Sequence, residues 1–151
     1  HPHVMGAMSV FLEKIESPQI VEIYQNVDLV WNQRREMFNQ VMVDKKLPLR
    51  AANMSSVWSL YYTEPSRYNW MLQYYLRSEG LALSWVGTGR LIFSLNYSDD
   101  EFAEVLKRFV NACERMTADQ WFWAPPELTN QKIKRGIFKE MFFSKNQFSS
   151  N

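Results

Sequence analysis

The spacing of apolar residues changes between residues 44 and 54, and this change constrains the fold more than any other feature of the sequence. Before it, apolar side chains recur at steps of three and four, which is typical of amphipathic helices. From residue 54 to residue 62 they alternate with small and polar residues, and a period of two is typical of a strand. The helical period then returns. The chain is therefore predicted to have an α+β fold.

Residues 1–47 are predicted to form a helical arm of two helices. Pro18 separates the helices, because it disfavours helical geometry at Ser17 and suits the first position of a new helix. The apolar stripe of the first helix is Val4, Ala7, Met8, Phe11, Leu12 and Ile15. The second helix, from about Pro18 to Val43, has the stripe Ile20, Tyr24, Val27, Trp31, Met37, Phe38 and Val41, and residues 33–36 form its most polar turn. We expect the arm to bury one face.

Residues 48–117 are predicted to form the core, a small sheet in the order β-α-β-β-α with helices on one face. The strand at residues 54–62 has apolar or small residues on both sides, which favours a central strand covered on both faces. A helix follows at residues 68–79, and Gly80 stands where a left-handed cap belongs. Two strands, Leu81–Val86 and Arg90–Tyr97, are then joined by Gly87, Thr88 and Gly89, which suit a hairpin turn.

The last helix of the core has the clearest start signal. Ser98 and Glu101 have the spacing of a capping box, in which each side chain bonds the backbone N–H of the other residue. The buried stripe that follows is predicted to be Phe102, Val105, Leu106, Phe109, Val110, Cys113 and Met116.

Residues 118–151 are expected to form an apolar linker, Trp121–Pro126, and a final amphipathic helix, from about Leu128 to Phe143.

Composition excludes several classes of protein. A net charge of +1 gives no electrostatic case for a binder of nucleic acid or of anionic membranes. The single cysteine excludes an internal disulfide and fits a reducing compartment. No apolar run is long enough to span a bilayer, so we expect a cytoplasmic protein.

The chain begins with His1-Pro2-His3 rather than methionine, and we expect it to be part of a longer protein.

The residues that could carry chemistry have simpler explanations. His1 and His3 lack a neighbouring carboxylate or thiolate, which argues against a metal site, and Cys113 lies on an apolar stripe with no histidine partner. Residues 87–90 suit a hairpin better than a phosphate loop, and residues 99–101 suit a helix start. We therefore expect no catalytic, cofactor-binding or metal-binding residue in this chain.

The C-terminal helix leaves two interpretations open. Its basic residues lie near Trp121 and Trp123, as in proteins that bind single-stranded nucleic acid. The helical spacing of Ile133, Ile137 and Phe138 instead favours docking on a protein surface. Because the net charge is close to neutral, we favour the protein surface.

Three segments resemble class III pyridoxal-phosphate aminotransferases, most of all the glutamate-1-semialdehyde aminomutase branch. The run from Gly80 to Phe102 is similar to the end of their small domain, where a strand, a loop and a strand-to-helix join follow one another. His1-Pro2 and the helix after it resemble the family's Asn-Pro helix start. Residues 121–135 resemble the tail of aminotransferases embedded in polyketide or peptide synthetase assembly lines.

This resemblance implies a homodimeric enzyme with pyridoxal phosphate held by a lysine of a large cofactor-binding domain. In the family, that lysine and the phosphate-binding segments precede the region matched by this chain. The chain alone is therefore expected to be inactive. Its implied role is to close the active site and shape specificity through the loop of Trp85, Gly87, Thr88, Gly89 and Arg90.

Two departures from the family narrow the implied chemistry. Gly89 stands where the aminomutases have a substrate-facing Glu, and Phe93 or its neighbours stand where ornithine-type enzymes have an Arg. An aminotransferase acting on a carrier-bound or otherwise unusual carbonyl substrate is therefore favoured, with Arg90 expected to be an exposed hairpin residue. The alternative is a free-standing α+β module for protein interaction or dimerisation.

Overall fold

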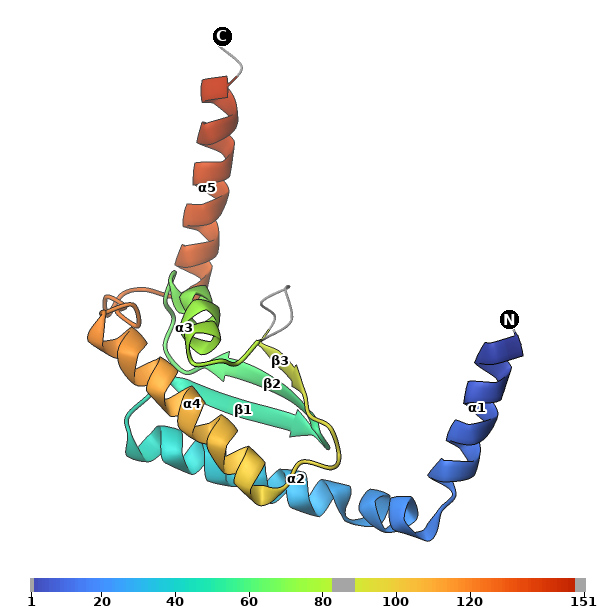
Figure 1. Cartoon of the computed structure of the whole chain (residues 1–151). Helices are drawn as coiled ribbons and strands as arrows, with labels where there is room; N and C mark the ends of the chain where they lie inside the picture. The colour runs from blue at the N-terminus through green and yellow to red at the C-terminus, as the bar shows by residue number, and fades with distance from the viewer. Residues whose placement is uncertain (1, 83–88, 149–151) are drawn as a thin grey trace.

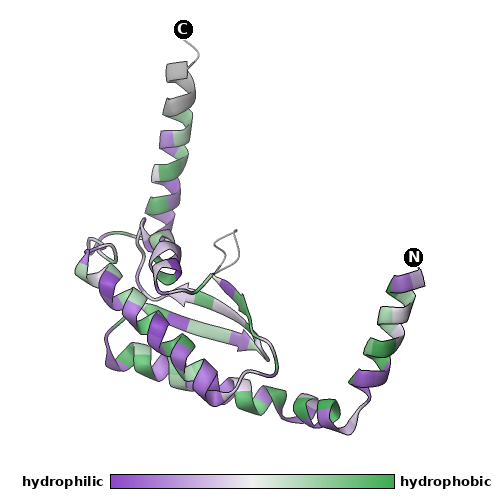
Figure 2. Ribbon diagram, in the orientation of Figure 1, coloured by the Kyte–Doolittle hydropathy of each residue, from purple (hydrophilic) through white to green (hydrophobic). Residues whose placement is uncertain are grey.

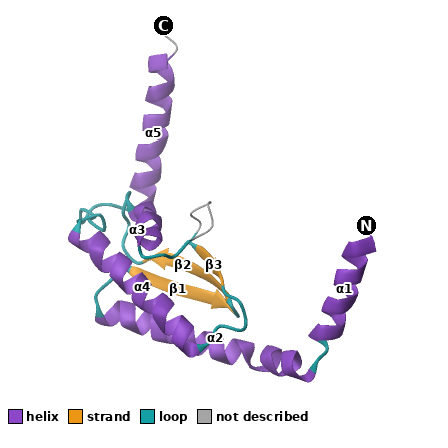
Figure 3. Cartoon of the chain, in the orientation of Figure 1, coloured by secondary structure: helices purple, strands orange, loops and turns teal. Residues whose placement is uncertain are grey.

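The computed structural model describes residues 2–82 and 89–148 (Figure 1). The described elements are α1 (Pro2–Ile15), α2 (Pro18–Asp44), β1 (Leu49–Met54), β2 (Val57–Tyr62), the 3-10 turn η1 (Asn69–Met71), α3 (Leu72–Ser78), β3 (Arg90–Ile92), α4 (Asp99–Ala118) and α5 (Asn130–Phe148). Figure 3 shows α2, α3 and α4 beside the sheet, while α1 and α5 project from it. The predicted α+β class is confirmed.

The described residues form a three-stranded antiparallel sheet in the order β1-β2-β3. Met54, at the end of β1, pairs with Val57, at the start of β2, so the single strand predicted at residues 54–62 is wrong. The chain reverses there with Ser55 at φ +53°. The sequence concealed this hairpin because its turn contains no glycine, the residue that most often marks such turns.

The element order in the described residues is consequently β-β-α-β-α rather than β-α-β-β-α. Leu81 and Ala82 lie outside any strand, and the rest of the predicted strand, with Gly87 and Thr88, lies outside the described residues. β3 ends at Ile92 instead of Tyr97, because Phe93 and Tyr97 pack into an aromatic cluster rather than extending the sheet.

Only one face of the sheet is covered by the described chain. Leu49, Ala51, Trp58 and Leu60 point inward and are buried, and the helices lie on this side, as predicted. On the outer face the exposed fractions are 78% for Met54, 72% for Ile92 and 50% for Tyr61. The expectation that a strand here is covered on both faces is therefore wrong for this chain. Alternation of apolar with small residues did not distinguish a half-covered sheet from a fully covered one.

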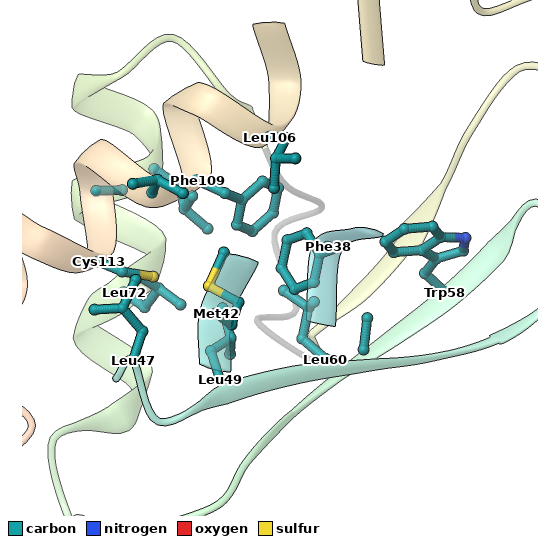
Figure 4. Close-up of a cluster of buried hydrophobic side chains, with 14 of the residues drawn as sticks. Phe38, Met42, Leu47, Leu49, Trp58, Leu60, Leu72, Leu106, Phe109 and Cys113 are labelled. Carbon is teal, nitrogen blue, oxygen red and sulfur yellow. The ribbon is translucent and has the colours of Figure 1, made fainter. Parts of the chain in front are cut away.

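The core lies between the sheet and the helices α2, α3 and α4 (Figure 4). Phe38 of α2 packs edge to face against Phe109 of α4, with ring centroids 5.4 Å apart. Trp31 and Trp58 meet in the same way at 6.1 Å. Aromatic pairs of this geometry stabilise a core beyond the area they bury.

The predicted signals at the helix ends are confirmed. The Ser98 hydroxyl accepts a hydrogen bond from the Glu101 N–H at 3.2 Å, and the Glu101 carboxylate accepts one from the Ser98 N–H at 2.8 Å. Gly80 has φ +83° and ends α3, where the Leu81 N–H donates to the Leu76 carbonyl at 2.8 Å. The α4 stripe is also confirmed, since its predicted members are buried, with Val105 half-buried.

The prediction that the arm of residues 1–47 buries one face is confirmed for α2, which buries Trp31, Arg34, Phe38 and Met42, but not for α1. Within the described part of the chain, no residue of α1 is buried. Figure 2 shows apolar residues along α1 and α5, the two helices that leave the sheet region. No helix among the described residues has the length and apolar character to cross a bilayer.

Candidate functional site

The predicted substrate-facing loop is described only at its end. Trp85, Gly87 and Thr88 lie outside the described residues, whereas Gly89 directly precedes β3 and Arg90 is its first residue. The Gly89 carbonyl accepts a hydrogen bond from the Leu60 N–H at 2.7 Å, which ties this corner to the middle of β2.

Gly89 has a backbone that only glycine adopts easily. Its φ is +69°, and a Cβ added here would lie 2.9 Å from the Leu60 carbonyl oxygen. That oxygen belongs to a central strand and cannot move aside cheaply. A glutamate at position 89 therefore does not fit this backbone without a shift of the strand.

Arg90 lies on the outer face of the sheet, opposite Ser59 in the neighbouring strand. It is exposed, and among the described residues no acidic side chain forms an ion pair with it. Tyr61 follows two residues after Ser59 on the same face. A guanidinium with nearby hydroxyls can bind a carboxylate or a phosphate, so this edge has the right chemistry to hold an anionic part of a substrate.

Arg34 fixes the segment that follows β3. Its guanidinium donates from Nη2 to the Tyr97 carbonyl and to Asp99 Oδ1, both at 2.8 Å. It also lies over the ring of Trp31, 4.7 Å from the centroid, and over that of Phe102 at 5.4 Å. One buried side chain thus joins α2, the segment after β3 and the start of α4.

Sequence reasoning missed Arg34 because it lies in the most polar turn of α2. A signal was nevertheless present: Arg34 stands three residues after Trp31 and four before Phe38, which places it on the buried stripe. A charged residue in register with such a stripe indicates a buried cation with specific partners.

Phe93 does not lie on the outer face with Arg90. Its ring stacks on Trp31, with centroids 4.9 Å apart and planes 25° apart, and meets Trp58 at 5.2 Å. The position at which ornithine-type enzymes were expected to have an Arg is thus part of the inner aromatic cluster, not of the exposed edge.

A second candidate region is a groove between the N-terminal helices and the segment after β3. It encloses about 470 Å³. Its apolar walls are Phe11, Ile15, Ile20, Ile23, Tyr24 and Leu95. A neighbouring hollow of about 330 Å³ shares Ile23 and Leu95 and continues along α2 to Trp31. The two together form one apolar groove.

The remaining candidates from the sequence have structural roles. Cys113 is fully buried, and burial raises the pKa of its thiol to about 12, so it is no nucleophile at neutral pH. Asp99 pairs with Arg34, and Glu101 caps α4. The described residues contain no group of three histidine, cysteine or acidic side chains placed to hold a metal ion, and His1 lies outside them.

The described residues do not fit pyridoxal phosphate by themselves. Among the described residues, the apolar groove is lined by one lysine, Lys14, and one carboxylate, Glu22, which lie in different hollows of the groove and are both exposed to solvent. The other lysines whose side chains the structure describes are exposed on the surface. No step of catalysis is therefore assigned to this chain's own lysines.

Comparison with solved structures finds a similar fold in an enzyme. A transaminase with pyridoxal phosphate bound matches 70% of this chain with a TM-score of 0.55 and 17% sequence identity. The match covers 26% of that transaminase chain, so this chain spans about a quarter of its length. No family model and no curated protein matches the sequence. At this identity the likeness concerns the fold.

Proposed function

We propose that the chain is the small domain of a pyridoxal-phosphate-dependent aminotransferase, similar to the glutamate-1-semialdehyde aminomutase branch. The lysine and the cofactor belong to a large domain, and this domain closes over the cleft between them. The fold likeness to a transaminase over 70% of the chain supports this proposal, together with the sequence resemblance from Gly80 to Phe102.

The observation that carries the proposal is the uncovered outer face of the sheet. Met54, Tyr61 and Ile92 are exposed there, although the solvent face of an antiparallel sheet is ordinarily polar. A large cofactor-binding domain packed on this face would bury them and bring the Gly89–Arg90 edge to the cleft.

The geometry of Gly89 supports an aminotransferase rather than an aminomutase. The aminomutase acid would have to occupy position 89, where a side chain meets the Leu60 carbonyl. Arg90 is the described residue of this edge that could contact substrate. Its positive charge suits a substrate with an anionic group, such as one attached to a phosphate-bearing carrier.

Substitution of Arg90 in the complete enzyme tests this role. Arg90→Ala is expected to raise KM for the carbonyl substrate about tenfold or more, while the absorbance of the lysine-bound cofactor stays unchanged. The matched control is Arg77→Ala, which removes an exposed arginine from α3, away from the sheet. Equal KM values for the Arg90 variant and the parent enzyme would overturn the assignment.

The isolated chain gives a separate test. Mixed with pyridoxal phosphate, it is expected to develop no cofactor band that depends on a specific lysine, and no amino-group transfer. The opposite result is a cofactor absorbance band that a single lysine substitution abolishes, together with measurable amino-group transfer. This result would contradict a role confined to closing the active site.

A free-standing interaction module remains the alternative, and the exposed apolar residues of α1 and α5 favour it. The gene distinguishes the two. A reading frame extending ~280 residues upstream, room for a cofactor-binding domain, supports the aminotransferase. A native start close to His1 supports the module.

A further inference from the structure

Contacts with the segment before α3 hold α5 in one direction. The Ser66 hydroxyl lies 3.3 Å from the Trp121 carbonyl oxygen, and the ring of Tyr68 meets that of Trp121 at 5.1 Å. Arg67, between these two residues, forms an ion pair with Glu140 of α5. The ion pair turns the Glu140 side of α5 toward the core.

Two phenylalanines lie on the opposite side of α5 from this ion pair. Phe138 and Phe142 stand two residues before and two after Glu140, which places each of them about 160° around the helix from it. Their exposed fractions are 61% and 70%, and Met141 beside them is also exposed. Because Glu140 faces the core, this apolar row faces away from it, on a helix that projects beyond the sheet region (Figure 1).

Positive charge accompanies the apolar row. Lys134 and Arg135 stand four and three residues before Phe138, which makes them its neighbours on the helix surface. Both are exposed, and no acidic side chain among the described residues forms an ion pair with them. Residues 130–143 contain four basic residues and one acidic residue, a net charge of +3. The acidic one, Glu140, is on the side that faces the core.

The net charge of the whole chain conceals this local excess, because acidic residues elsewhere reduce it to +1. Helix α1 provides the contrast. It also projects and has exposed apolar residues such as Phe11, but its charged residues are one acid, Glu13, and one base, Lys14. The positive apolar surface is therefore a property of α5 and not of every projecting helix in this chain.

An apolar row flanked by cations matches a surface that is apolar inside and negatively charged at its boundary. The interface of a bilayer that contains anionic lipids has both properties, and helices that lie in it typically have Lys and Arg beside Phe. A flat bilayer also needs no groove matched to the row, so a single projecting helix can reach it without hindrance from the core.

We propose that α5 binds reversibly to the surface of membranes that contain anionic lipids. The helix lies in the plane of the interface, with Phe138 and Phe142 turned toward the acyl chains and Lys134 and Arg135 at the phosphate groups. The stems of the basic side chains lie along the apolar surface while their charged ends reach the headgroups. This attachment uses α5 alone and leaves the outer face of the sheet free for another domain.

Sedimentation of the full 151-residue chain with lipid vesicles tests the binding. One set of vesicles is phosphatidylcholine alone, and the other contains about one third phosphatidylserine. The chain is expected to bind the anionic vesicles about tenfold or more strongly than the neutral ones, because several cations meet the negative surface. Added salt should reduce this difference, because it screens the attraction between the charges.

Variants of α5 test which residues are responsible. Phe138→Ser and Phe142→Ser are each expected to weaken binding to the anionic vesicles about tenfold, and Arg135→Gln about fivefold. Phe11→Ser is the control for apolar residues, since Phe11 of α1 has nearly the same exposed fraction, 59%. Arg77→Gln is the control for charge, since Arg77 is exposed on α3. Neither control should change the binding.

A fluorescent label tests which helix enters the lipid. Phe138→Cys carries a dye whose emission shifts to shorter wavelength in apolar surroundings, and this shift is expected when anionic vesicles are added. The same dye on Phe11→Cys should show no shift. Cys113 takes no dye because it is fully buried.

Three results would overturn the proposal: no binding to anionic vesicles, equal binding to both kinds of vesicle, or an equal loss of binding in Phe11→Ser and Phe138→Ser. The first would leave a protein surface as the partner of α5. The proposal goes beyond the aminotransferase assignment and rests on no part of it. The vesicle tests need no cofactor or substrate, and the kinetic tests above do not depend on α5, so either proposal can fail alone.

Discussion

The side-chain amide of Asn39 and the backbone of Ala51 form a two-way hydrogen-bonded pair. Asn39 Nδ2 donates to the Ala51 carbonyl at 2.9 Å, and the Ala51 N–H donates to Asn39 Oδ1 at 2.7 Å. β1 is an edge strand of the described sheet. Asn39 thus occupies the bonds through which another strand could join this edge.

Asn39→Ala should therefore destabilise the fold by about 1–3 kcal/mol, because a partly buried N–H and carbonyl lose their partners. Urea unfolding followed by circular dichroism measures this change. Gln40→Ala is the control, since Gln40 bonds Asp44 of the same helix and is exposed. Equal effects of the two substitutions would show that the pair does not protect the edge.

Gly89→Ala should destabilise the chain by about 1–3 kcal/mol, because its φ is positive and the new Cβ would meet the Leu60 carbonyl oxygen. Gly6→Ala should instead have no cost or a small gain, since Gly6 lies within α1 with open space around it among the described residues. Thermal unfolding of both variants is the measurement. If Gly89→Ala left the stability unchanged, position 89 could hold a side chain, and the argument against a glutamate there would be wrong.

Arg34 and Asp99 should contribute unequally although they are bonded to each other. The Asp99 side chain is 95% exposed, so Asp99→Ala should cost less than about 1 kcal/mol. Arg34→Ala should cost about 2 kcal/mol or more, because the packing on Trp31 and Phe102 is lost with the charge. Denaturant unfolding of both variants measures the two losses of stability. Equal losses would show that the ion pair alone accounts for the effect.

The thiol of Cys113 should resist modification in the native chain. Its pKa is raised from the ordinary 9.0 to about 12, mainly by burial, so almost no thiolate exists at pH 8. The stabilisation linked to this shift is fully present below pH 9 and is lost as the pH rises toward 12. Labelling with a thiol reagent, with and without denaturant, checks this. Rapid stoichiometric labelling of the folded chain would contradict the prediction.

The cap of α4 should make the chain sensitive to acid. The Ser98 backbone N–H and then its hydroxyl, both bonded to the Glu101 carboxylate, hold the pKa of Glu101 below 4.5. Because the pKa of Glu101 is lower in the folded chain, the cap contributes stability above pH 4.5, and this contribution is lost as the pH falls below 4.5. Glu101→Gln keeps an acceptor but cannot titrate, so its stability should vary less between pH 5 and pH 3. Glu13→Gln removes a carboxylate from the exposed helix α1 and is the control. Identical pH profiles for Glu101→Gln and the parent chain would contradict the role of the cap.

Three helix ends were predicted well because each is marked by residues that start or stop a helix. Pro18 begins α2, Gly80 ends α3, and the capping box at Ser98 begins α4 within one residue of the expectation. Such signals act within a few residues of the chain and do not depend on what packs nearby.

The strands were harder to predict because their pattern depends on distant residues. The turn at Ser55 contains no glycine, and β1 is held largely through its pairing with β2 and the bonds to Asn39. Similarly, periodicity identified the apolar faces of α1 and α5 but could not say whether this chain covers them. At the candidate site, the sequence indicated Gly89 and Arg90, while the role of Arg34 required the packing of α2 on α4.

The length of α2 has a mechanical consequence. Its 27 residues form one uninterrupted rod about 40 Å long, and the buried residues begin only at Trp31, near its middle. The half of α2 before Trp31 has no buried residue, so the aromatic cluster around Trp31 is the first buried contact that holds the helix. Phe93, whose ring stacks on Trp31, follows directly after β3, so a displacement of the exposed half of α2 would act on Phe93 and on the strand that begins with Arg90.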